Sequence, residues 1–255
     1  MATCRMLGIP CAGSLSAREA HALLRRGGRV VVKPALDHGS ARGLQVLERA
    51  ADLEQAISSC EAKYGACLLQ EFIAGGAEAM RSLTLLVDGA GRLGGSFLLQ
   101  KLRHVPETGV NTALARSCHD PALLQMVLPF FAHNRWRGPA EVECLWDERC
   151  GRFRVIEINP RFPGNLRLSA ICGLNLPLLA ALASTGAPRP PAPEGPAYAE
   201  GVLYLAPTLF ARTVMADARR NGWGRALRAT WGDAAGSGPV SAVFWQNRCR
   251  SWPAA

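Results

Sequence analysis

Two glutamates and an asparagine in the second half of the chain have the types and spacing of a metal site. Glu143 and Glu157 lie in two apolar runs, residues 139–146 and 153–159, that a short turn separates. If the runs pair as a hairpin, the two carboxylates lie nearly opposite each other at about 5 Å, where like charges repel. Alternation along the second strand adds Asn159 to the same face. Carboxylate and carboxamide oxygens are ligands for Mg²⁺ or Mn²⁺, so the pattern predicts a cation site.

Arg161 continues this polar face, and Arg167 follows it. Either guanidinium could bind a phosphate group through two parallel hydrogen bonds, which a lysine does less well. The other interpretation is a solvated polar face on an edge hairpin, in which Arg161 is only the counter-ion of the glutamates. The spacing alone leaves both interpretations open.

Lys33 ends a strand with three valines, RVVVK, and is one of only three lysines in the chain. An ammonium group at a strand end is placed to contact phosphate. The loop that follows, with Gly39, Ser40 and Gly43, lies between two strands, whereas a P-loop or a dinucleotide fold requires a helix after its glycines. Its backbone amides could still close over phosphates as a flap. The alternative is an ordinary glycine turn.

Glu78 follows a small-residue hinge, residues 74–77, where a carboxylate could accept hydrogen bonds from ribose hydroxyls. Taken alone it could equally be a surface glutamate. His104 has no cysteine, serine or aspartate partner at a motif spacing, which favours a packing or solvent role. Neither G-x-S-x-G nor H-E-x-x-H occurs, so nothing indicates a serine hydrolase or a zinc protease.

Composition narrows the class of protein further. The chain has 255 residues, a formal net charge of +9 and nine cysteines. The basic residues are scattered, which argues against a nucleic-acid partner and fits an anionic ligand such as a nucleotide. The cysteines show no zinc spacing, so reduced thiols are expected. Without an export leader or an apolar run long enough for a bilayer, we expect a cytoplasmic protein that binds no membrane.

Both helices and strands are expected to position these residues. The expected helices cover 15–27, 53–63, 120–133, 174–184 and 208–220, and the expected strands cover 29–33, 44–47, 68–73, 83–87, 94–99, 139–146, 153–159 and 201–205. A loop at 102–115 and a segment at 162–173 are expected to contact substrates. Prolines in residues 185–197 indicate a linker. The tryptophan-rich end beyond it is expected to pack on the chain's own core or to cover an interface.

In chain order, six motifs resemble those of the ATP-grasp superfamily, most closely its carbamoyl-phosphate-synthase-like and carboxylate-amine ligase branch. They are LGIP (7–10), VVKP (31–34), GSARG (39–43), LQEFIAGGAE (69–78), GPAEVE (138–143) and IEINPRFPG (156–164). The resemblance implies an α+β fold of two lobes, each with an antiparallel sheet and helices, and ATP between them. It implies a small nucleotide-binding lobe (1–75), a large lobe with the metal and phosphate site (76–184), the linker (185–197) and a C-terminal extension packing on the large lobe (198–255).

The resemblance also implies a role for each candidate residue. The cofactor-binding set would comprise Lys33, Gly39, Ser40 and Gly43 at the ATP phosphates, the backbone of Glu71, Phe72 and Ile73 at adenine, and Glu78 at the ribose. The metal ligands of Mg²⁺ or Mn²⁺ would be Glu143, Glu157 and Asn159. Arg161 would be the catalytic contact with the transferred phosphoryl group. Arg81, Lys101 and Arg103 would face the nucleotide from the large lobe.

The activity implied is that of a ligase, in which ATP converts a carboxylate into an acyl phosphate that an amine or ammonia attacks. Phosphoryl transfer needs mainly positioning and charge neutralisation, which fits the absence of a catalytic triad. Members of the superfamily carry an α/β domain ahead of the LGIP motif, whereas seven residues precede Gly8 here. The expectations are therefore a start further upstream, a homodimer or separate chain that supplies this domain, or a non-catalytic ATP-binding subunit.

Overall fold

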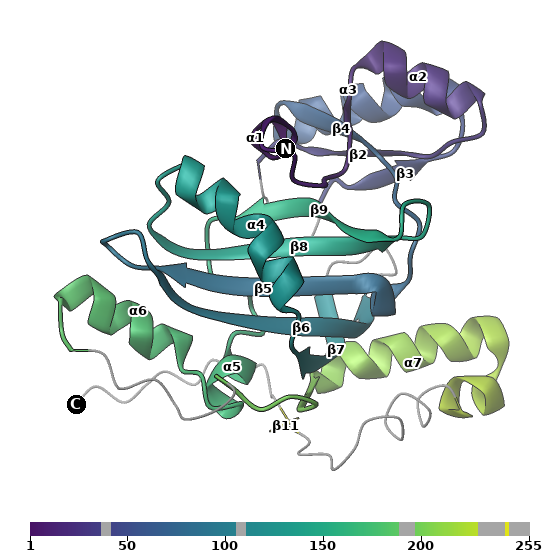
Figure 1. The fold of residues 1–255 in the computed structure, drawn as a ribbon. Helices are drawn as coiled ribbons and strands as arrows, with labels where there is room; N and C mark the ends of the chain where they lie inside the picture. Colours follow the sequence, from purple (N-terminus) through teal and green to yellow (C-terminus); the bar gives the residue numbers. More distant parts are fainter. Residues whose placement is uncertain (37–41, 106–110, 189–196, 229–242, 245–255) are drawn as a thin grey trace.

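Two β-sheets form the body of the protein (Figure 1). This computed structural model describes residues 1–36, 42–105, 111–188, 197–228 and 243–244. The small sheet has the strand order β1-β4-β2-β3, and the large sheet has the order β11-β10-β7-β6-β5-β8-β9. Every neighbouring pair of strands is antiparallel except β10 and β11. Two antiparallel sheets with helices confirm the predicted α+β class.

Two helices cover one face of the small sheet (Figure 1). Its elements are β1 (Ser14–Leu15), α2 (Ala17–Arg25), β2 (Val30–Pro34), β3 (Gln45–Leu47), a 3₁₀ turn (Ala50–Asp52), α3 (Leu53–Tyr64) and β4 (Cys67–Glu71). The helix α2 begins where Ser16 and Glu19 form a capping box, which satisfies two backbone amides. Val30 and Val32 are buried beneath the helices. Alternation therefore turns Lys33 to the other face of the sheet.

The large sheet has helices on both faces. Its strands are β5 (Met80–Val87), β6 (Leu93–Val105), β7 (Asn111–Cys118), β8 (Gly138–Asp147), β9 (Arg152–Asn159), β10 (Leu203–Leu205) and β11 (Val243–Phe244), and a 3₁₀ turn (Ala77–Ala79) precedes β5. Its helices are α4 (Pro121–His133), α5 (Arg167–Ile171), α6 (Leu176–Thr185) and α7 (Pro207–Asn221). Leu83, Leu85 and Val142 pack under α4, whereas Leu86 and Phe97 pack against α5 and α6 on the other face.

The first residues of the chain pack on the large sheet, although they were expected within the small lobe. The helix α1 (Ala2–Met6) buries Cys4, and Cys4 and Ile9 belong to the core beneath α4. The amide of Ala12 donates to the carbonyl of Val155 at 2.8 Å. This segment therefore follows the outer edge of β9 before the chain enters the small sheet.

Every predicted helix and strand is present, but the prediction of a loop at 102–115 is wrong. The strand β6 continues to Val105 and β7 begins at Asn111, while residues 106–110 lie outside the described part. β7 buries the small residues Ala113 and Ala115 in place of the β-branched residues that strands favour, so it gave little signal. The described residues contain no helix that is long and apolar enough to span a bilayer.

Candidate active site

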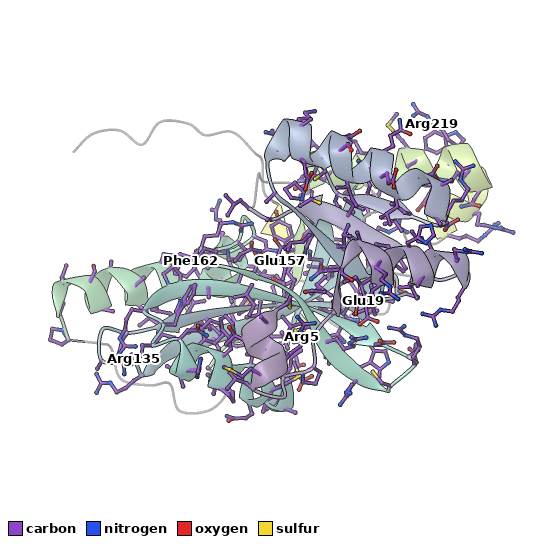
Figure 2. All side chains as sticks on the ribbon, turned by 90° about the horizontal axis from the view of Figure 1, so that it is seen from above. Arg5, Glu19, Arg135, Glu157, Phe162 and Arg219 are labelled. Carbon is purple, nitrogen blue, oxygen red and sulfur yellow. The ribbon has the colours of Figure 1, made fainter. Side chains whose placement is uncertain are left out.

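The site is organised by a β-bulge in β9. Glu143 pairs with Glu157 across the hairpin, as predicted, but the next residue Cys144 pairs with Val155. Ile156 is therefore the extra residue of the bulge, with no partner on β8. Cys144 and Val155 are buried in the core beneath α4, so Glu143 and Glu157 lie on the opposite face of the sheet. In Figure 2 Glu157 lies near the middle of the molecule.

A third carboxylate, which the prediction missed, lies on the same face. Glu141 pairs with Asn159, and only 6 % of the residue is exposed. Its carboxylate accepts hydrogen bonds from the Ser82 hydroxyl at 2.7 Å, from the Asn159 amide at 3.4 Å and from Arg161 at 3.2 Å. Burial, and then the negative charge of Glu143, raise the pKa of Glu141. Its position two residues before Glu143 was the signal in the sequence.

Two cations accompany these carboxylates. The ammonium of Lys101 donates to Glu143 at 2.5 Å, and the lysine side chain is only 2 % exposed. Arg161 lies at the rim, with its side chain 46 % exposed, and pairs with Glu141. Charges of opposite sign therefore alternate in the cluster, with Glu143 paired to Lys101 and Glu141 paired to Arg161.

Lys33 approaches this cluster from the small sheet. Its Nζ donates to the carbonyl of Ile156 at 3.2 Å. That carbonyl belongs to the bulged residue, which lies directly before Glu157 in the chain. The structure thus brings Lys33, Glu143, Glu157, Asn159 and Arg161 to one region between the two sheets.

The oxygen atoms of the cluster fit a hard cation. The carboxamide nitrogen of Asn159 is engaged by Glu141, while its oxygen has no partner among the described residues. Asn159 therefore presents an oxygen beside Glu143 and Glu157, a donor set that suits Mg²⁺. Three acidic, histidine or cysteine side chains do not converge as a metal site anywhere in the described residues. A cation here would rest on two carboxylates, one carboxamide and further ligands from water or substrate.

The residues predicted to hold adenine lie at the junction of the sheets. The amides of Glu71 and Phe72 donate to the carbonyls of Gly13 and Arg29, so neither amide is open to a ligand. The backbone of Ile73 has no hydrogen bond with any described residue, and its side chain is buried. Of the three backbone amides, that of Ile73 alone has no partner within the described residues.

The side chain of Glu71 has a structural role that the prediction did not include. Its carboxylate accepts a hydrogen bond from the amide of Gly13 at 2.8 Å and forms an ion pair with Arg154. Arg154 also forms an ion pair with Asp147 at 2.9 Å. Burial raises the pKa of Glu71, but the hydrogen bonds from Arg154 and Gly13 outweigh it and lower that pKa. Arg149 and Arg154 hold the pKa of Asp147 well below its usual range. This network joins β4 of the small sheet to the β8–β9 hairpin.

The remaining predicted cofactor-binding residues are Glu78, Gly43, Gly39 and Ser40. Glu78 lies in the turn before β5, where its carbonyl accepts hydrogen bonds from Arg81 and Gln100. Gly43 has φ +83°, and a Cβ there would lie 2.6 Å from the Tyr64 ring, so its backbone requires glycine. Gly39 and Ser40 lie outside the described residues.

Arg81 and Arg103, which were expected to face the nucleotide, make other contacts in the structure. Arg81 is on the α4 face of the sheet, because it pairs with Cys144. Arg103 forms an ion pair with Asp217 of α7 at 2.7 Å. The contact of α7 with β6 could not be predicted, because no local pattern around Asp217 encodes it.

Solved structures with the same arrangement identify the fold. Biotin carboxylase of Campylobacter jejuni, in a β,γ-ATP complex, superposes with a TM-score of 0.57 at 18% identity and covers 74% of this chain. N5-carboxyaminoimidazole synthetase of Staphylococcus aureus, complexed with ADP, gives 0.58 at 17% identity over 74%. The chain has the ATP-grasp fold. No protein-family model and no curated protein sequence matches it.

A third solved structure has the same fold, and each match covers only part of the solved protein. The biotin carboxylase domain dimer of Hydrogenobacter thermophilus 2-oxoglutarate carboxylase, solved with MgADP, ADP and bicarbonate, has a TM-score of 0.57 at 16% identity and covers 79% of this chain. The chain covers 46%, 51% and 47% of these three proteins in the order given. It therefore spans about half the length of each of these three structures.

Proposed function

We propose that this chain is an ATP- and Mg²⁺-dependent ligase that activates a carboxylate as an acyl phosphate. An amine or ammonia then attacks the acyl carbon, a C–N bond forms, and inorganic phosphate leaves. The observation that carries the proposal is the approach of Lys33 from one sheet to the oxygen cluster of the other. The matched structures that contain adenine nucleotides support it.

Each residue of the cluster has a part in this reaction. Lys33 would leave the Ile156 carbonyl to bind the ATP phosphates, and the open backbone of Ile73 would bind adenine. Arg161, at the exposed rim, would bind the transferred phosphoryl group as it moves to the carboxylate. Mg²⁺ held by Glu143, Glu157 and Asn159 would neutralise charge on the phosphates.

Calorimetry with Mg-ATP tests the binding half of the proposal. The protein should bind Mg-ATP, and Glu157→Gln should reduce ADP release with carboxylates and amines by about 100-fold or more while the fold is retained. Glu54→Gln, an exposed change on α3, is the matched control and should leave ADP release unaffected. The proposal fails if no heat of Mg-ATP binding is detected.

The second candidate is an ATP-binding subunit that depends on a partner chain or a second copy. It is favoured by the internal pairing of cations that would otherwise meet phosphate, Lys101 with Glu143 and Arg103 with Asp217. ADP release separates the two candidates, because a binding subunit alone should bind Mg-ATP and release no ADP with any carboxylate and amine.

A further inference from the structure

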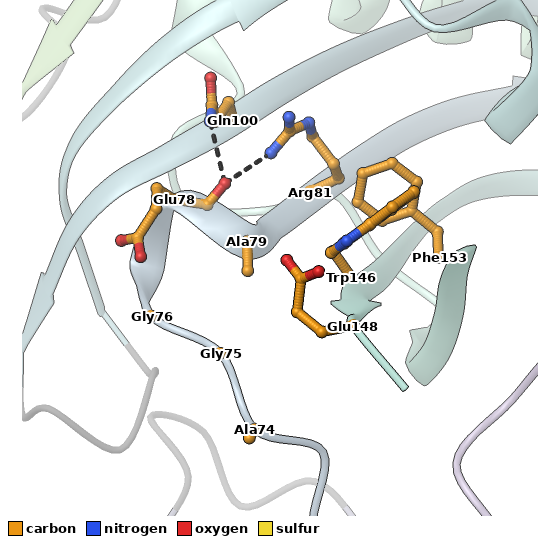
Figure 3. A pocket seen from close by; sticks show the side chains of 10 residues that line it. All are labelled: Ala74, Gly75, Gly76, Glu78, Ala79, Arg81, Gln100, Trp146, Glu148 and Phe153. Atoms are coloured by element: carbon orange, nitrogen blue, oxygen red, sulfur yellow. Dashed lines mark hydrogen bonds between the residues drawn. The ribbon is translucent and has the colours of Figure 1, made fainter. Parts of the chain in front are cut away.

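A cavity of about 440 Å³ is lined by Arg81, Trp146 and Phe153 among other residues, as Figure 3 shows. It lies on the face of the large sheet opposite to Glu143. Arg81 pairs with Gln100 of β6 and with Cys144 of β8, and Cys144 is buried beneath α4. Alternation therefore places Arg81 and Gln100 on the α4 face, while Ser82 faces the carboxylates. The sheet itself separates this cavity from Glu143, Glu157 and Asn159, whereas Glu78, the predicted ribose contact, lines the cavity.

One wall of the cavity is aromatic. Trp146 and Phe153 pair across the β8–β9 hairpin, and their ring centroids are 5.1 Å apart in an edge-to-face arrangement. The guanidinium carbon of Arg81 lies 5.2 Å from the centroid of the Phe153 ring. The rings provide an apolar surface for a side chain, and the volume is typical of small-molecule sites.

The charged groups around this wall have both signs. Arg81 donates through Nη1 to the carbonyls of Glu78 and Met80, while its Nε and Nη2 make no hydrogen bond with any described residue. The carboxylates of Glu78 and Glu148 also line the cavity, and neither accepts a hydrogen bond or ion pair from the described part of the chain. Figure 3 shows Arg81 and Glu148 around the same opening.

We propose that this cavity binds a free α-amino acid with an apolar side chain. Its carboxylate pairs with Nε and Nη2 of Arg81, its ammonium group pairs with Glu148 or Glu78, and its side chain packs on Trp146 and Phe153. An amine without a carboxylate leaves Arg81 unmatched. A simple carboxylate or dicarboxylate is repelled by the two glutamates. Only a zwitterion satisfies both signs, and the proposal does not rest on the proposed ligase activity.

Titration calorimetry on the full chain without nucleotide tests this site. L-Phenylalanine, L-leucine and L-methionine are titrated separately, and at least one should bind with a Kd of about 1 mM or tighter. Phenethylamine, which lacks the carboxylate, and 3-phenylpropionate, which lacks the ammonium group, should bind at least about tenfold more weakly than L-phenylalanine.

Variants assign the binding to the cavity. Arg81→Lys keeps a donor for the Glu78 carbonyl but loses the planar fork, and should weaken binding about tenfold. Glu148→Gln, at an exposed position, should weaken it about fivefold, while the matched control Glu54→Gln should leave it unchanged. Absence of binding by all three amino acids overturns the proposal. Binding that both cavity variants leave intact, or equal binding of phenethylamine, also overturns it.

Discussion

The ion pair between Lys101 and Glu143 should make the site sensitive to the loss of one charge. Lys101 is 2 % exposed and Glu143 is 14 % exposed. Removing one member of a buried pair costs about 3–5 kcal/mol, because the other charge remains unpaired in a poorly solvated place. Glu143 keeps some contact with water, so about 3 kcal/mol is expected for Lys101→Met. Methionine is similar in length to lysine, which keeps the cavity term small.

The assay is urea unfolding, followed by circular dichroism in the presence of EDTA so that no cation replaces the ammonium. In a separate thermal scan, the same loss of about 3 kcal/mol would appear as a fall in Tm of about 6–12 °C for a chain of this size. The double variant Lys101→Met with Glu143→Gln removes both charges, and should be destabilised by about 1 kcal/mol or less relative to the wild type.

The comparison of the two variants is decisive. If Lys101→Met is as stable as the wild type within about 0.5 kcal/mol, the pair has no energetic role of this kind. If the double variant is as unstable as the single one, the loss comes from packing of the lysine stem. Either result refutes the reasoning that an unpaired Glu143 carboxylate is the source of the instability.

Two further predictions concern stability. Because Arg149 and Arg154 lower the pKa of Asp147, this carboxyl group contributes stability above its unfolded pKa of about 3.9 and loses it as the pH falls through lower values. Unfolding free energies measured from pH 6 to pH 3 should therefore fall more steeply in the wild type than in Asp147→Asn, and parallel curves would contradict this. Gly43→Ala should cost about 1–3 kcal/mol in thermal or urea unfolding, because it adds a Cβ against Tyr64 at a positive φ, and an unchanged midpoint would contradict it.

The part of the site that follows from local pattern could be predicted. Counting residues across the β8–β9 turn placed Glu143 opposite Glu157, and the structure has this pair. The register at the turn, Asp147 with Arg152, would by itself set Glu143 opposite Ile156, so the pair depends on the bulge. The position of Glu141 on the same face follows from alternation, because it lies two residues before Glu143 on one strand. The bulge at Ile156 could not be predicted from the sequence, because a bulge depends on the neighbouring strand and not on its own residue type.

Contacts between segments far apart in the chain could not be predicted from the sequence. Lys33 was expected at a ligand, but its hydrogen bond to Ile156 joins residues 123 positions apart. The ion pair of Arg103 with Asp217 likewise depends on where α7 packs. Such pairs are set by the packing of whole elements, and no local spacing or propensity encodes them.

The bulge at Ile156 shifts the alternation of side chains between the two faces of β9 by one residue. Val155 and Glu157 are two positions apart, and in a regular strand they would share a face. The extra residue lets the odd-numbered positions before it serve the apolar core and those after it serve the charged cluster. Deleting Ile156 would restore the regular ladder, force either a valine into the cluster or two polar groups into the core, and remove the carbonyl that Lys33 uses. This strand should therefore accept substitutions at several positions but no change in its length.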